Sequence, residues 1–172
     1  TDIVGPGRYL LTDGGYSPRG AEGMVFLVSE DGRLLHYWRS LTEDTHSSER
    51  IPLKNGEVLV ADTGFGAIFR LAADGEVLWR SDWVEPFSDG SSIDFPNDAD
   101  PLPNGHYLIS DRDNHRVFEM DETGMIYWQF GETGVAGSDR THLDQPHNPD
   151  RLPNGNTIIA DSSNNRILEV DA

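Results

Sequence analysis

The sequence predicts an all-β protein, a β-propeller built from four-stranded antiparallel blades. Three observations lead to this prediction: a unit of about fifty residues recurs along the chain, turn-forming dipeptides recur within it, and short β-forming runs lie between the turns. The chain has 172 residues and 18 glycines, which is ordinary for a folded protein with one sizeable core.

The repeat is clearest in the C-terminal half. Residues 102–121 read LPNGHYLISDRDNHRVFEMD, and 50 positions later residues 152–171 read LPNGNTIIADSSNNRILEVD. A third copy, LKNGEVLVADTGFGAIFRLAADGEVLWRS, lies 49 residues before the first of these, and a weaker fourth contains GPGRYLLTD and MVFLVSEDGRLLHYW. The copies divide the chain into blades at about residues 1–43, 44–90, 91–140 and 141–172.

Each copy has the same β-forming pattern. Asn-Gly precedes one apolar run, and Asp-Gly or Thr-Gly separates the next two, as expected for tight hairpin turns. The runs, such as EVLVAD, AIFRLA and EVLWRS, are rich in β-branched and aromatic residues, and no helical stripe competes with them. With one preceding strand, each copy makes a four-stranded meander of the size of a propeller blade.

The last copy ends at RILEVDA and lacks the sequence of a fourth, outer strand. About four blades are therefore expected, the last one without its outer strand. An open sheet face and open strand edges invite association. We expect a part of a larger propeller, or a propeller closed between chains, whose partners are further blades of the same chain or other protein chains.

Two sets of repeated residues have a structural interpretation. Large rings near the end of the blades can fill the gap between neighbouring blades, and these are Trp38, Trp79 and Trp128. Charged residues that flank the turn between the second and third strands are expected to form structural ion pairs or turn caps rather than catalytic groups. They are Asp111 with Arg116, and Asp161 with Arg166.

The charge of the chain excludes some classes of partner. Thirty acidic and 13 basic residues give a formal charge of −17, spread along the chain, which repels nucleic acid and anionic lipid. No apolar run approaches the ~18 residues of a membrane span, and TDIVGPGRYL lacks the features of a signal peptide. An acidic surface is typical of a secreted protein or of a protein from a saline setting, and we expect an extracellular or cell-surface location.

The pattern H-N-x-D-x-L-P-N-G-N-x-I-I-A-D-x-x-N-x-R-I-x-E-V-D resembles the repeats of arylsulfotransferase-like propellers and of the wider pyrroloquinoline-quinone-dehydrogenase-like and NHL-type group. The resemblance covers essentially the whole chain. It implies a propeller, which in this group serves scaffolds, binding modules and several enzyme classes. Arylsulfotransferase-like propellers are expected to carry about six blades.

The resemblance also indicates candidate site residues. In arylsulfotransferase-like enzymes a histidine in the central funnel takes the sulfuryl group, and amide or cationic donors stabilise its oxygens. His147 and the following Asn148 match this place and are the catalytic candidates. Asn97 holds the equivalent position one copy earlier, and His46 lies near it in the copy before that; both are candidate ligand-binding residues. Alternatively, His147 caps a strand or bonds a neighbouring loop.

Neither a metal nor a cofactor is expected. His142 and His147 lack a third ligand, and the sequences DRDN and DSSNN do not have EF-hand spacing. We therefore favour a non-catalytic extracellular module for binding or protein assembly, with a small aromatic compound as a possible ligand. The alternative is an arylsulfotransferase-like enzyme that transfers a sulfuryl group between phenolic compounds through His147, and a quinone-dependent dehydrogenase ranks third. Whether the chain is an enzyme stays open.

Overall fold

The computed structural model describes residues 2–3, 8–13, 23–39, 45–50 and 56–171. Within these ranges the strands form four antiparallel sheets, which we call blades one to four in chain order. Apart from one short 3-10 turn at Ser81–Trp83, the regular structure described is all β, as predicted.

Blades one to three contain four strands each, and blade four contains three. Blade one comprises β1 (Asp2–Ile3), β2 (Arg8–Asp13), β3 (Met24–Ser29) and β4 (Leu34–Arg39). Blade two comprises β5 (Thr45–Arg50), β6 (Val58–Asp62), β7 (Ala67–Leu71) and β8 (Val77–Arg80). Blade three comprises β9 (Pro96–Pro101), β10 (Tyr107–Asp111), β11 (Arg116–Met120) and β12 (Ile126–Phe130). Blade four comprises β13 (Pro146–Arg151), β14 (Thr157–Asp161) and β15 (Arg166–Val170).

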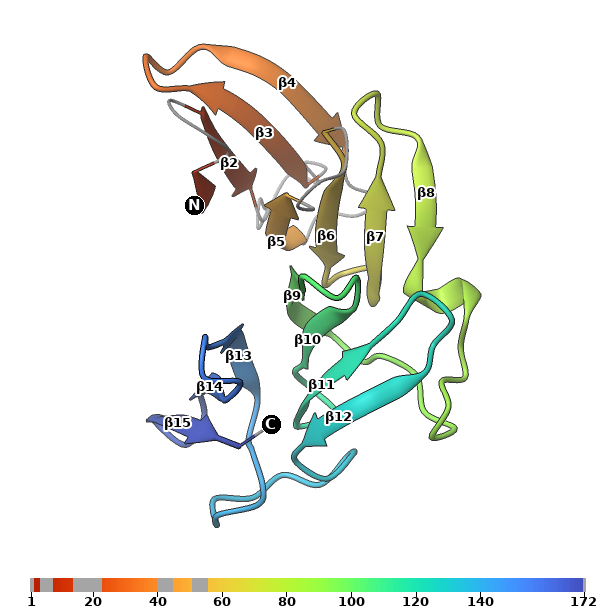
Figure 1. The fold of residues 1–172 in the computed structure, drawn as a ribbon, viewed down its shortest axis with the longest axis vertical. Helices are drawn as coiled ribbons and strands as arrows, with labels where there is room; N and C mark the ends of the chain where they lie inside the picture. The colour runs from red at the N-terminus through yellow and green to blue at the C-terminus, as the bar shows by residue number, and fades with distance from the viewer. Residues whose placement is uncertain (1, 4–7, 14–22, 40–44, 51–55, 172) are drawn as a thin grey trace.

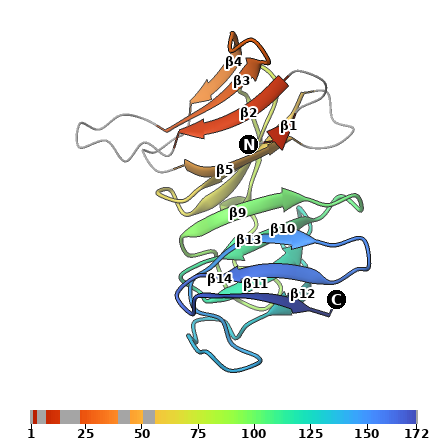
Figure 2. The ribbon, with the colours of Figure 1, turned by 90° about the vertical axis from the view of Figure 1, so that its left-hand side faces the viewer.

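The blades follow one another along an arc that does not close (Figure 1). Strands β5, β9 and β13 lie on the inner side of this arc, and β8 and β12 lie on its outer side. The side view in Figure 2 shows β9 and β13 running close together across the inner side. This arrangement confirms the predicted propeller of four blades, the last of which lacks an outer strand among the described residues.

The repeated turns form as the sequence predicts. Gly105 and Gly155 have φ angles of 87° and 93°, which a residue with a Cβ adopts only under strain. In each turn the glycine N–H donates to the carbonyl three residues earlier, at 3.0 Å for Leu102 and 2.9 Å for Leu152. The Asn-Gly dipeptide therefore fixes where the first strand of the blade ends and the second begins.

The core consists of apolar layers between consecutive blades. We call the face of a blade that packs on the next blade its leading face, and the opposite face its trailing face. Leading-face residues are Leu10 and Val25 in blade one, Leu59 and Ile68 in blade two, and Leu108 and Val117 in blade three. Trailing-face residues are Val60 and Phe69 in blade two, Ile109 and Phe118 in blade three, and Ile159 and Leu168 in blade four.

The tryptophans fill the junctions between blades, as predicted. The indole N–H of Trp38 donates to the carbonyl of Ala72 in blade two at 2.9 Å. Trp79 donates in the same way to Glu122 in blade three, also at 2.9 Å. Trp128 packs into the layer between blades three and four, with the Arg151 guanidinium 4.8 Å from the centre of its ring.

Candidate functional site on the open face of blade four

The Asp/Arg motif forms the predicted ion pair in blade three. The Nε of Arg116 lies 2.7 Å from Asp111 Oδ2, and both side chains are fully buried. Asp111 also accepts hydrogen bonds from the backbone N–H of Asp94 and the amide of Asn114. Burial raises the pKa of Asp111 to about 6, against the lowering effect of Arg116 and these donors.

Blade four repeats this network with different outer partners. Arg166 Nε lies 2.6 Å from Asp161 Oδ2, and Asp161 accepts from the amide of Asn164. The Nη atoms of Arg166 donate to three backbone carbonyls of the preceding loop, those of Ser138, Asp139 and His142. Four N–H groups of this guanidinium are thus engaged, and its role is to hold the loop against the blade.

The leading face of blade four differs from those of the other blades in its exposure. Val25, Ile68, Val117 and Ile167 occupy the same place in consecutive blades, opposite equivalent residues of the second strand. The first three have 0–1% of their surface exposed, because the next blade covers them, whereas Ile167 is 64% exposed. The described chain therefore presents, at blade four, a face that is buried in the other three blades.

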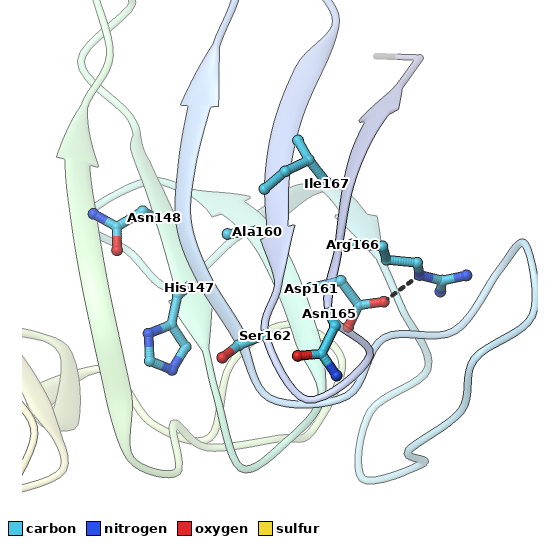
Figure 3. A pocket seen from close by; sticks show the side chains of 8 residues that line it. All are labelled: His147, Asn148, Ala160, Asp161, Ser162, Asn165, Arg166 and Ile167. Carbon is cyan, nitrogen blue, oxygen red and sulfur yellow. Dashed lines mark hydrogen bonds and ion pairs between the residues drawn. The ribbon is translucent and has the colours of Figure 1, made fainter.

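A pocket of about 480 Å³ lies on this open face. His147 and Asn148 of β13 line it together with Ala160 of β14 and Ile167 of β15, and the Asp161–Arg166 pair lies beside the turn at one end (Figure 3). Asn148 has a φ of 41°, and the pairing of β13 with β14 shifts register between His147 and Asp150. This irregularity sets the inner rim of the pocket.

The structure brings together two of the candidate site residues. His147 and Asn148 are neighbours on β13 and line the same pocket. Asn97 is buried on β9, at the equivalent position of blade three, and does not line this pocket. His46 lies on β5, but its side chain is outside the described residues. The sequence analysis did not identify Ile167 as part of a site, although its alignment with Val117 in the last of the described blades is the signal that indicates it.

Charged side chains also join consecutive blades across their leading faces. Arg70 of blade two pairs with Glu122 of blade three, and Glu119 of blade three binds Arg151 of blade four at 2.8 Å. Glu169 is the equivalent of Glu119 in blade four, and it accepts hydrogen bonds from the amides of Asn154 and Asn156 in its own blade. These bonds lower the pKa of Glu169 below its ordinary value, so the open face carries a negative charge.

The other histidines take part in local networks. His142 contacts Asp139 at 2.9 Å and Glu132 at 3.3 Å, and these carboxylates raise its pKa. His106 lies 2.8 Å from Glu119, in the charged network between blades three and four. Among the described residues, no group of three or more acidic, histidine or cysteine side chains is arranged to hold a metal ion. None of the described helical structure is long and apolar enough to cross a membrane.

The fold is that of a β-propeller whose described blades form an open arc. Residues 36–172 match the model of the PQQ-type repeat family described as outer membrane protein assembly factor BamB. The chain therefore belongs to that family, which bears out the pyrroloquinoline-quinone-type part of the resemblance seen in the sequence. A comparison with curated proteins gives no match.

Solved structures share the fold at low sequence identity. A protein of unknown function from Bacteroides caccae aligns with a TM-score of 0.68 and 17% identity, over 98% of this chain and 61% of its own. The WD40 β-propeller domain of Doa1 gives 0.65 and 14%, over 98% and 47%. Virginiamycin B lyase from Staphylococcus aureus gives 0.56 and 15%, over 97% and 56%. The chain thus spans about half to three fifths of the length of these structures.

Proposed function

We propose that this chain is a non-catalytic β-propeller module that binds another protein surface through the leading face of blade four. The observation that carries the proposal is the exposure of Ile167 at a position that the next blade covers in the three other blades. A sheet face that is covered at the equivalent place in the three other blades, and that carries an exposed apolar side chain among polar groups, is the kind of surface that a protein partner covers.

The family adds support for a role in protein binding. Its description names a factor for the assembly of outer membrane proteins, and such a factor must bind other polypeptides. We therefore propose that the chain works outside the cytoplasm, in keeping with the extracellular or cell-surface location expected from its acidic composition. A small aromatic ligand in the pocket remains a subsidiary proposal that rests on its apolar wall.

A binding experiment tests the proposed function. The immobilised chain should retain one or more defined proteins from a detergent-solubilised outer-membrane fraction, and Ile167→Arg should abolish their retention. Trp83→Arg is the matched control, because Trp83 is 58% exposed at the end of the 3-10 turn that follows β8, away from blade four. Equal retention by the Ile167→Arg variant would show that the open face is not the binding surface.

A sulfotransferase activity is the second candidate, favoured by the presence of His147, Asn148 and Arg166 around one pocket. The arrangement of the arginine argues against this activity. Arg166 uses four N–H groups on Asp161 and on backbone carbonyls, so it is poorly placed to stabilise a sulfuryl group in transfer. Release of 4-nitrophenol from 4-nitrophenyl sulfate together with sulfation of an added phenol, both lost in His147→Ala at unchanged thermal stability, would establish this activity in place of the binding role.

A further inference from the structure

Blade one presents an open face that is the counterpart of the open face on blade four. Leu11, Phe26 and Tyr37 are cross-strand partners on β2, β3 and β4, so their side chains lie side by side on the trailing face of blade one. No other described blade packs on this face: Leu11 is 38% exposed and Tyr37 46%. The residue equivalent to Leu11 in blade two, Val60, is 2% exposed because blade one covers it.

The two open faces correspond to the two sides of the junctions between consecutive blades. Three times along the chain a leading face packs on a trailing face, and in each case the same pair of positions shares an apolar layer. These pairs are Val25 with Val60, Ile68 with Ile109, and Val117 with Ile159. The next pair in the series would be Ile167 with Leu11, but these residues lie on blades at opposite ends of the arc (Figure 1).

From this complementarity we infer that the leading face of blade four binds the trailing face of blade one in a second copy of the chain. The inference deepens and rests on the proposed function, since it names the partner of the same face. The contact is head to tail, because it joins two different surfaces of the chain. In an open dimer the trailing face of blade one stays exposed on one copy, and the leading face of blade four stays exposed on the other. Both faces are covered only if the assembly closes into a ring.

Charge weakens this contact compared with the junctions inside the chain. In blade four, Arg151 pairs with Thr157 on the next strand and supplies the cation opposite Glu119. In blade one, Ile3 pairs with Tyr9 in the same way, so Ile3 has the backbone position that corresponds to Arg151. A second copy thus has an uncharged residue type at the backbone position that corresponds to Arg151. Each copy also carries a formal charge of −17. Association should therefore strengthen with salt, because screening reduces the repulsion between copies.

Cysteine trapping tests the contact directly, because the chain has no cysteine of its own. Leu11→Cys and Ile167→Cys are prepared as separate proteins, mixed at 0.5 M NaCl, and treated with a short bismaleimide. The expected product is a mixed dimer of the two variants. Trp83→Cys mixed with Ile167→Cys is the control for random collision, and we expect roughly tenfold less product from it, as for contacts without a specific orientation.

Sedimentation velocity of the unmodified chain gives an independent measurement. We expect a dimer or larger species that increases with salt and that is lost in Ile167→Arg. A monomer at all concentrations without mixed product overturns the inference, and so does a dominant product of Ile167→Cys with itself. In either case, retention of outer-membrane proteins by the immobilised chain would leave the proposed function standing.

Discussion

The indole N–H of Trp79 in blade two donates to the backbone carbonyl of Glu122 in blade three at 2.9 Å. Trp38 makes the corresponding bond from blade one to Ala72 in blade two. In both cases the tryptophan lies on the outer strand of one blade, packed in the apolar cluster between the blades, and donates to the turn between the last two strands of the next blade. The repeated tryptophan therefore fixes the orientation of consecutive blades as well as filling the space between them.

Replacement of Trp79 by phenylalanine should reveal the energy of this bond. The variant keeps a large ring but leaves the Glu122 carbonyl without its donor, so we expect a loss of about 1–3 kcal/mol in the free energy of unfolding. Trp83→Phe is the control and should change stability by less than about 0.5 kcal/mol, because its ring is exposed. Urea denaturation followed by circular dichroism measures both, and equal effects would contradict the role assigned to Trp79.

Arg116 and Arg166 form equivalent ion pairs at different depths. Arg116 is fully buried, whereas the side chain of Arg166 is 27% exposed. Arg116→Met leaves the buried Asp111 without its cation and should cost about 3–5 kcal/mol of stability. Arg166→Met should cost less, because solvent reaches this network. Thermal denaturation of the two variants side by side checks the order, and a larger loss at Arg166 would show that burial does not control these pairs.

The raised pKa of Asp111 gives the pH dependence of stability a definite sign. Its pKa of about 6 in the folded protein exceeds the ordinary value of 3.8, so between these values the folded state binds more protons than the unfolded state. This group therefore makes stability fall as the pH rises from about 4 to 6. Asp111→Asn should remove that contribution, which is seen by comparing urea midpoints of the variant and the unmodified chain across this pH range. Parallel curves would contradict it.

The sequence predicts the blades well because each depends on residues close together in the chain. Asn-Gly and Asp-Gly positions specify turns, and runs such as HYLISD specify strands, so the repeat alone defines the sheets. The open face could not be found in the same way. RVFEMD and RILEVD have the same pattern, yet Val117 is buried and Ile167 is exposed, since exposure depends on whether another blade covers the residue.

The backbone irregularity at Asn148 also escaped sequence analysis. The strands PNDADP and PHNPDR are aligned repeats, but only the second contains a residue with a positive φ, at Asn148. His147 and Asn148 were identified from a family pattern and do line a pocket, whereas Asn97, aligned with His147, is buried. Residues at equivalent positions of the repeat thus have different surroundings, because their blades occupy different places along the chain.

The pKa of His142, in the exposed loop before blade four, should depend on its acidic neighbours. Its imidazole contacts Asp139 and Glu132, which raise its pKa above the ordinary 6.5. The interaction contributes stability that is fully present below pH 6.5 and is lost as the pH rises through the raised pKa. NMR titration of the ring protons should give a midpoint above 6.5, and Asp139→Asn should lower it. An unchanged midpoint in that variant would show that Asp139 is not responsible.

Two glycines in the same loop allow the cost of a strained backbone conformation to be measured apart from the cost of a steric clash. Gly131 and Gly134 both have positive φ angles, of 92° and 76°. A Cβ on Gly134 would meet nothing within 4 Å, whereas one on Gly131 would lie 2.4 Å from the carbonyl oxygen of His115 and 3.1 Å from the Cα of Arg116. Gly134→Ala should therefore cost only the left-handed conformation, about 1–2 kcal/mol.

Gly131→Ala should cost more than about 3 kcal/mol, because the backbone that carries Arg116 must move to admit the methyl group. That displacement should also disturb the buried pair of Arg116 with Asp111, so the variant should lose part of the pH dependence assigned to Asp111. Urea denaturation at pH 4 and pH 6 measures both effects, with Gly134→Ala as the reference. Equal losses for the two variants would mean that the loop moves freely away from β11, and that Gly131 is required only for its φ angle.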